Sequence, residues 1–160
     1  MTKKIAEKFQ ILVDADACPK PIKEIIYRAA INRKIIALFV ANQYLNLPDS
    51  DYVLSKIVSQ GFDVADQYII DQAKACDLVI TSDIPLADAV IEKGAFVITP
   101  YGKVYDQNNI KQALAKRNFL TEMRDAGLIQ SRTKAFSNKA SYGFATAFDR
   151  YLTQILKINN

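Results

Sequence analysis

Two short apolar segments end abruptly in aspartate and lead into helical sequence, and this pattern limits what the chain can fold into. In the first, residues 11–13 precede Asp14 and Asp16; in the second, residues 78–80 are soon followed by Asp83. Uninterrupted apolar segments of this length that feed helices are typical of buried parallel strands. The chain is therefore predicted to adopt an α/β fold built on a mainly parallel sheet.

The carboxyl ends of parallel strands lie at one edge of the sheet, and open α/β proteins bind their ligands there. We expect Asp14, Asp16, Asp83 and Asp88 to meet at this edge and take them as candidate catalytic residues. Carboxylates that lie so close together cannot all stay ionised without a compensating cation. An all-oxygen cluster favours Mg²⁺ or Mn²⁺, and the candidate ligands are Asp14, Asp83, Asp88 and Asp66.

The sequence contains no histidine, and this absence removes several classes of chemistry. Serine–histidine–aspartate triads, cysteine–histidine dyads and histidine-ligated zinc are excluded. Two cysteines, Cys18 and Cys76, are too few for a zinc site made of cysteine alone. Acid–base chemistry then depends on carboxylate, lysine, tyrosine, cysteine or metal-bound water.

Length and hydropathy favour one soluble globular domain. A chain of 160 residues with 50% hydrophobic and 24% charged residues can bury a proper core. No apolar run approaches the ~20 residues that a membrane span needs, so no membrane partner is expected. Acidic and basic residues interrupt the first eight positions, which therefore do not resemble a secretory signal. A cytoplasmic location is expected.

The net charge of +4 is unevenly distributed. Residues 1–99 carry 11 basic and 13 acidic side chains, whereas residues 100–160 carry 10 basic and only 4 acidic ones. The acidic residues thus lie mainly in the part of the chain that contains the predicted metal site, and the last third of the chain is predominantly basic. This division suits a metal site beside a phosphate-binding surface, although a helical tail with basic residues on its exposed face would produce it as well.

Hydrophobic periodicity predicts alternating strands and helices. Strands are expected at residues 10–13, 34–41, 54–58, 78–81 and 96–99, and helices at 19–32, 63–75, 85–93, 109–126 and 138–158. The expected architecture is three-layered, with helices on both faces of a mainly parallel sheet. We expect a single domain over residues 1–160, with an α/β core at 9–100 and a basic helical extension at 101–160.

Some of the aspartates have simpler interpretations. Asp83 is well placed to cap the helix that follows it, and Asp88 to act as an exposed acid in the first turn of that helix. Asp63 and Asp66 have the spacing of a helix cap and its partner, although Asp66 stays a candidate ligand because this helix begins near the same sheet edge. Capping explains Asp14 and Asp16 less well. Cys18 lacks the nearby arginine of a cysteine phosphatase and is interpreted as a buried bystander.

Several polar residues are candidates for substrate binding near this edge. They follow predicted strands or lie in the basic C-terminal third: Asn42, Thr81, Ser82, Lys103, Arg132 and Lys134. Further basic residues that could contact phosphates are Arg117, Arg124 and Lys139. The aromatic residues among them that could stack on bases are Tyr101, Tyr105, Phe136 and Tyr142.

Three segments resemble the YaiI/YqxD family of bacterial proteins. They are Val13-Asp14-Ala15-Asp16-Ala17-Cys18-Pro19, Gly61-Phe62-Asp63-Val64-Ala65-Asp66 and Asp77-Leu78-Val79-Ile80-Thr81-Ser82-Asp83-Ile84-Pro85-Leu86-Ala87. Shorter matches at 92–95 and 136–137 extend the likeness over about residues 11–152. The family is grouped with the PIN-like superfamily, whose better-known members are metal-dependent nucleases. The resemblance implies a PIN-like fold, with acidic residues at Asp14, at Asp66 or Asp63, and at Asp83.

The leading hypothesis is therefore a Mg²⁺- or Mn²⁺-dependent nuclease that hydrolyses phosphodiester bonds, with RNA as the expected partner. One alternative is a PIN-like module that binds RNA or a protein without catalysis. A second alternative is a haloacid-dehalogenase-like phosphatase with Asp14 as its nucleophile. That chemistry also needs a lysine from a later helix, for which Lys74 and Lys93 are the candidates.

Overall fold

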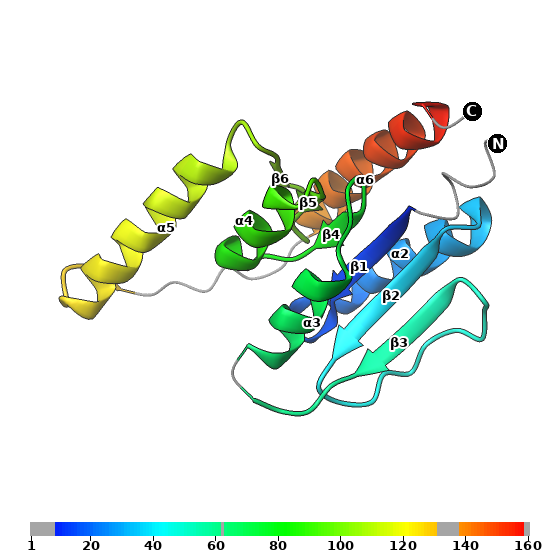
Figure 1. Ribbon diagram of the computed structural model, residues 1–160, viewed down its shortest axis with the longest axis horizontal. Coiled ribbons are helices and arrows are strands. Elements are labelled where there is room, and N and C mark those ends of the chain that lie inside the picture. The colour runs from blue at the N-terminus through cyan, green and yellow to red at the C-terminus, as the bar shows by residue number, and fades with distance from the viewer. Residues whose placement is uncertain (1–8, 62, 131–137, 159–160) are drawn as a thin grey trace.

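The computed structural model describes residues 9–61, 63–130 and 138–158, which form one six-stranded sheet with helices on both faces (Figure 1). The strand order is β3-β2-β1-β4-β5-β6. Neighbouring strands from β3 to β5 pair in parallel, and only β6 runs antiparallel to its neighbour. The strands are β1 (Gln10–Asp14), β2 (Ile36–Ala41), β3 (Val53–Ile57), β4 (Leu78–Ile80), β5 (Phe96–Ile98) and β6 (Val104–Tyr105).

Five α-helices and one short 3₁₀ turn connect and cover these strands. The turn η1 (Ala15–Ala17) follows β1 directly and leads into the first helix. The helices are α2 (Lys20–Arg33), α3 (Val64–Gln72), α4 (Ile84–Glu92), α5 (Ile110–Asp125) and α6 (Asn138–Ile158). Within the described residues, no helix is both long enough and apolar enough to cross a membrane.

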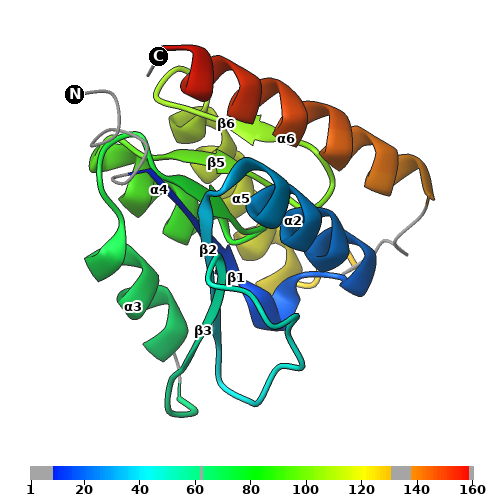
Figure 2. The ribbon, with the colours of Figure 1, turned by 90° about the vertical axis from the view of Figure 1, so that its right-hand side faces the viewer.

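The helices divide into two layers, one on each face of the sheet (Figure 2). On one face, α2 and α6 bury Ile22, Ile26, Phe144 and Phe148 against alternate residues of the strands. On the other face, α3 and α4 pack onto the remaining strand residues, and Ile110 of α5 joins their core. Side chains of a strand point alternately to the two faces, so a continuously apolar strand serves both cores. The three-layer α/β/α arrangement predicted from the sequence is therefore confirmed.

The predicted elements match the observed ones closely. All five predicted strands and all five predicted helices are present, with most bounds displaced by only one or two residues. The predictions missed η1 and β6, each of which is too short to produce a periodic signal. Asp63 occupies the position before α3 as predicted, but its backbone is left-handed (φ 62°) and its side chain makes no capping hydrogen bond. The capping interpretation of Asp63 is therefore wrong.

Candidate functional site

The candidate site lies where the strand order of the sheet reverses. From β1 the chain proceeds outward through β2 to β3, and it then returns to pair β4 with the opposite side of β1. Helices that leave the two sides of such a point cover opposite faces, which leaves a crevice beyond the carboxyl ends of the central strands. Asp14 ends β1, and Thr81 directly follows the neighbouring strand β4. Both residues are therefore at the position where this class of fold binds ligands.

Thr81 connects two of the predicted site aspartates through its hydroxyl group. Its Oγ1 donates a hydrogen bond to Asp14 Oδ2 over 3.0 Å and accepts one from the backbone N–H of Asp83, also over 3.0 Å. Asp83 in turn caps α4, because its Oδ1 accepts from the backbone N–H of Leu86 at 3.0 Å. The capping interpretation of Asp83 is thus confirmed. It leaves a second carboxylate oxygen on Asp83 available for other contacts.

Asp66 approaches these carboxylates from the first turn of α3. Burial, the charges of Asp83 and Asp14, a hydrogen bond with Asp83 and the charge of Asp63 raise the pKa of Asp66 from 3.8 to about 7. Burial raises the pKa of Asp14 as well, against a smaller lowering by the Thr81 hydrogen bond, and the charges of Asp83 and Asp16 raise it further. The structure thus brings Asp14, Asp66 and Asp83 close enough together for their charges to interact.

Asp16 lies beside this group and is attached to the next loop. Its Oδ2 accepts a hydrogen bond from the backbone N–H of Asn42 at 2.9 Å. Asn42 follows β2, so this bond ties the turn after β1 to the loop after β2 at the same edge of the sheet. Both residues are exposed. Asp16 therefore lies at the rim of the site, and Asn42 reaches it through its backbone.

A cavity of about 360 Å³ adjoins the aspartates on the α3–α4 side of the sheet. Asp63, Asp66 and Gln67 of the α3 segment line it together with Asp83. Arg117 of α5 lines the same cavity. A cation beside a group of carboxylates is a natural partner for an anionic ligand that those carboxylates alone would repel.

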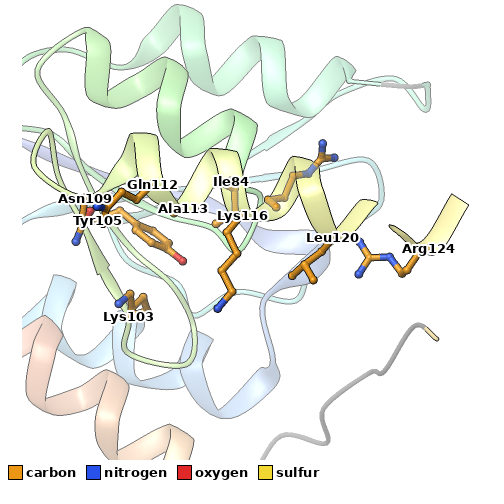
Figure 3. Close-up of a pocket in the computed structure, with 10 residues that line it drawn as sticks. Ile84, Lys103, Tyr105, Asn109, Gln112, Ala113, Lys116, Leu120 and Arg124 are labelled. Atoms are coloured by element: carbon orange, nitrogen blue, oxygen red, sulfur yellow. The ribbon is translucent and has the colours of Figure 1, made fainter. Parts of the chain in front are cut away.

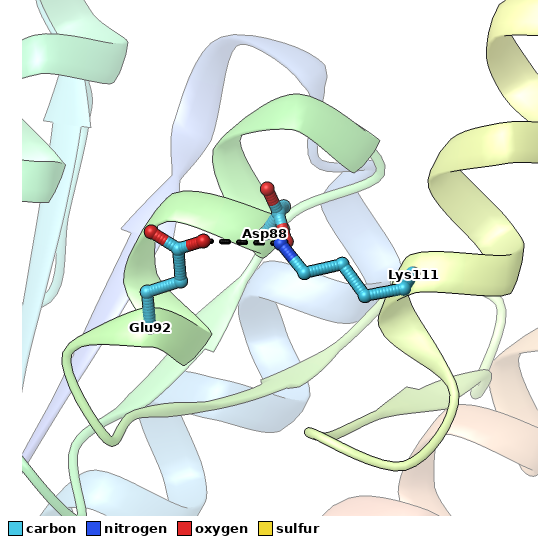
Figure 4. Close-up of polar contacts among 3 residues, drawn as sticks. All are labelled: Asp88, Glu92 and Lys111. Atoms are coloured by element: carbon cyan, nitrogen blue, oxygen red, sulfur yellow. Dashed lines mark hydrogen bonds and ion pairs between the residues drawn. The ribbon is translucent and has the colours of Figure 1, made fainter.

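Asp88 is not brought to the other aspartates. Its Oδ1 lies 2.7 Å from Lys111 Nζ, and the same ammonium group lies 3.0 Å from Glu92 Oε1 (Figure 4). Lys111 belongs to the first turn of α5, so this bridge joins α5 to α4. Asp88 follows Asp83 by five residues, a spacing that turns it about 140° around the helix, away from Asp83. Asp88 therefore serves helix packing where the sequence suggested catalysis and metal binding.

The remaining candidates for substrate binding are dispersed. Ser82 is exposed beside Thr81 at the sheet edge. Lys103 instead lines a second cavity, between β6 and α5, which Arg117 also borders. Arg132 and Lys134 lie outside the described residues. Lys116 lines the second cavity too and was not singled out from the sequence, although its spacing from Asn109 and Gln112 places all three on one face of the predicted helix.

The described residues at this edge do not support a mechanism with a cysteine nucleophile or with the lysine of a phosphatase. Burial raises the pKa of the Cys18 thiol to about 12, so the thiol stays protonated, as expected of a bystander. The two lysines considered for a phosphatase follow the carboxyl ends of α3 and α4, which lie at the opposite edge of the sheet. There Lys93 Nζ donates to the carbonyl of Ile70, and the backbone N–H of Lys74 donates to Asp77.

The donor set suits a hard divalent cation, although it does not enclose one. Oxygen ligands from Asp14, Asp66 and Asp83 are of the type that Mg²⁺ and Mn²⁺ accept. Across residues 9–61, 63–130 and 138–158, however, no three Asp, Glu or Cys side chains form a ready-made cage for a metal ion. Mg²⁺ usually retains several waters and takes only one or two protein carboxylates together with substrate phosphates. An open, partial ligand set is compatible with that mode of binding.

Comparison with known proteins identifies relatives along nearly the whole chain. A UPF0178 protein of Shewanella sp. (strain MR-7) is 46% identical to this chain over 149 residues, which cover 93% of this chain and 98% of the relative. A UPF0178 protein of Dechloromonas aromatica (strain RCB) is 51% identical over 146 residues, which cover 91% of this chain and 97% of the relative. No solved structure matches the chain significantly. Residues 12–154 match the profile of the family described as "Uncharacterized BCR, YaiI/YqxD family". The chain therefore belongs to the YaiI/YqxD family.

Proposed function

We propose that this protein is a Mg²⁺- or Mn²⁺-dependent nuclease that hydrolyses phosphodiester bonds in RNA at the edge formed by β1 and β4. The observation that carries the proposal is the convergence of Asp14, Asp66 and Asp83 at this edge, where burial and the charges of Asp83 and Asp14 raise the pKa of Asp66 to about 7. Carboxylates held in mutual repulsion lower the stability of the fold, and a bound cation relieves that repulsion. A site of this kind is what a metal-dependent hydrolase needs.

Each residue then has a defined part. Asp14 and Asp83 would supply carboxylate oxygens to the ion, and the Thr81 hydroxyl group holds the Asp14 carboxylate and the Asp83 backbone in place. A deprotonated Asp66 would complete the ligand set. A bound Mg²⁺ or Mn²⁺ would polarise the phosphate and activate the attacking water, which removes the need for a histidine base. Arg117 borders the cavity and would offset charge on the phosphate.

The alternatives fit the same residues less well. A phosphatase mechanism with Asp14 as the nucleophile also needs a lysine near Asp14. Lys74 and Lys93 both lie at the opposite edge of the sheet and cannot fill that role. A module that binds RNA without cleaving it would use the same basic surface, but it gives no reason for the repelling carboxylates. The PIN-like superfamily and a cytoplasmic location, both expected from the sequence, belong to this proposal as well.

Cleavage of labelled single-stranded and hairpin RNA in Mn²⁺ tests the proposal. The matched pair of variants is Asp83→Asn, which neutralises a proposed ligand, and Asp88→Asn, which neutralises an aspartate of the same helix outside the site. We expect wild type and Asp88→Asn to cleave, and Asp83→Asn and a chelator to abolish cleavage. Folded wild type that cleaves no RNA with Mg²⁺ or Mn²⁺, or unchanged cleavage by Asp83→Asn, would contradict the proposal.

A further inference from the structure

We propose that the groove between β6 and α5 binds a single strand of RNA and leads it to the carboxylates, an inference that rests on the proposed nuclease function. The groove has a volume of about 480 Å³, within the range of ~300–1,000 Å³ typical of ligand sites. Figure 3 shows Lys103, Tyr105 and Lys116 among the residues that line it. The residues that carry the argument are Lys103, Tyr105, Asn109, Lys116, Arg117 and Arg124.

The groove is positively charged and its lining contains no acidic residue. Four basic side chains line it, and in the part of the chain that the structure describes none of them forms an ion pair with a carboxylate. Helical spacing places Lys116, Arg117 and Arg124 on one face of α5, whereas Glu122 and Asp125 lie off that face. An uncompensated row of cations along a helix is complementary to a chain of phosphates.

Tyr105 provides a flat surface for a base. Its half-buried ring lines the groove, and Lys103 Nζ lies 5.9 Å from the ring centroid. Burial raises the pKa of the Tyr105 phenol, so the ring stays neutral beside a phosphate. A cation next to an aromatic ring is the combination with which proteins hold unpaired nucleotides, the cation on the backbone and the ring under the base.

The wall of the groove is held in place by Asn109. Its Nδ2 donates to the carbonyl of Val104 at 2.9 Å, and its Oδ1 accepts from the backbone N–H of Asp106 at 2.9 Å. These two bonds fasten the turn between β6 and α5. They connect the segment that carries Tyr105 to the start of α5, so contacts within the protein itself already form the binding surface.

Arg117 joins the groove to the candidate active site. It lines the basic groove and also the acidic cavity with Asp66 and Asp83, and it thus lies at the boundary between the two. A strand whose phosphates follow the basic face of α5 would place its next phosphates beside these carboxylates. A paired base cannot stack on Tyr105, so the occupant is a single strand and not a duplex.

Fluorescence anisotropy of a labelled oligouridine about 12 nucleotides long, measured in a chelator, tests the inference without metal or cleavage. The groove variant is Lys116→Ala/Arg124→Ala. Its matched control is Arg150→Ala/Lys157→Ala, which removes the same two charges from exposed positions on α6, on the other face of the sheet. Alanine is a strong helix former, so both variants should fold.

We expect the groove variant to bind at least tenfold more weakly than wild type, and the control less than twofold more weakly. The dependence of log K on log salt should become shallower by about 0.7 for each phosphate that the variant no longer neutralises. Tyr105→Leu should weaken binding about fivefold or more, whereas Tyr105→Phe, which keeps the ring, should not.

Failure of this inference can be told apart from failure of the nuclease proposal. RNA binding that depends on the groove, without cleavage in any divalent metal, would support the groove and overturn the nuclease. Metal-dependent cleavage with equal affinity and salt dependence in the groove variant and its control would overturn the groove alone. Tighter binding of an RNA duplex than of the oligouridine would also overturn the single-strand assignment.

Discussion

Thr81 donates its hydroxyl hydrogen to Asp14 Oδ2 over 3.0 Å, and this bond links the carboxyl ends of the two central strands, β1 and β4. The Thr81 hydroxyl oxygen, Oγ1, also accepts a hydrogen bond from the backbone N–H of Asp83. One buried hydroxyl group thus links the carboxylate of Asp14 to the backbone of Asp83, two residues 69 positions apart in the sequence. Removing it affects the site and the fold in ways that can be measured separately.

Replacement of Thr81 by valine keeps the shape of the side chain and removes both hydrogen bonds. We expect Thr81→Val to lose about 1–3 kcal/mol of unfolding free energy, because the backbone N–H of Asp83 and one oxygen of Asp14 lose their partner. Metal-dependent cleavage should fall with it. Urea unfolding and the RNA cleavage assay measure the two effects. Thr81→Ser retains the hydroxyl group and should retain activity; equal losses in both variants would contradict a role for the hydroxyl.

The pKa of Asp66 predicts how stability depends on pH in the absence of divalent ions. Its pKa is about 7 in the folded protein against an ordinary 3.8, so the folded state binds the proton more tightly than the unfolded state. Such a group favours folding below its unfolded pKa, and this contribution is lost as the pH rises through the folded pKa. The melting temperature of the metal-free protein should therefore fall between about pH 4 and pH 7.

Substitution of Asp66 separates this effect from the titration of other groups. Asp66→Asn should show a smaller fall in melting temperature over the same pH range, because the repelling charge is absent. Asp71→Asn changes an exposed carboxylate on the same helix and should behave like wild type. Mn²⁺ should raise the melting temperature of wild type most at the higher pH. A pH profile of Asp66→Asn that coincides with that of wild type would show that Asp66 carries no raised pKa.

Much of the fold and part of the site could be predicted because they depend on local sequence. Apolar segments that lead to Asp14 and Asp83 predict parallel strands, and parallel pairing brings the ends of these strands to one edge. The five-residue spacing between Asp83 and Asp88 was a sequence signal against placing Asp88 at the site, whereas its partner Lys111 could not be predicted, because that residue comes from a helix whose placement depends on tertiary packing. The sequence pointed to Lys103, Tyr105, Arg117 and Arg124 as RNA contacts, but not to the groove that joins them, since it forms only where α5 passes β6.

The contrast between Asp83 and Asp88 yields a prediction for stability as well as activity. Asp88→Asn weakens the exposed bridge to Lys111, which still has Glu92 nearby, so the melting temperature should change little. RNA affinity and cleavage should stay at the wild-type level. A large loss of cleavage in Asp88→Asn, with the fold intact by circular dichroism, would show that Asp88 takes part in the active site.

Gly102 holds the turn that carries Lys103 against α6. Its φ is +90°, and a Cβ atom there would lie 2.7 Å from the carbonyl carbon of Gly143. Left-handed backbone strain alone should lower the free energy of unfolding of Gly102→Ala by about 1–2 kcal/mol. We expect a larger loss, because the turn must also move away from α6. Gly127→Ala is the matched control, since its φ is +75° but the added Cβ would meet no described atom within 4 Å. Equal unfolding free energies for the two variants would exclude the close contact.

The central claim is that the aspartates at the ends of β1 and β4 hold a divalent cation, and direct Mn²⁺ titration followed by electron paramagnetic resonance tests it. We predict saturable Mn²⁺ binding to wild type and to Asp88→Asn near neutral pH, and its loss in Asp14→Asn. Folded wild type that leaves all Mn²⁺ free, or Asp14→Asn that binds Mn²⁺ as tightly as wild type, would contradict the account.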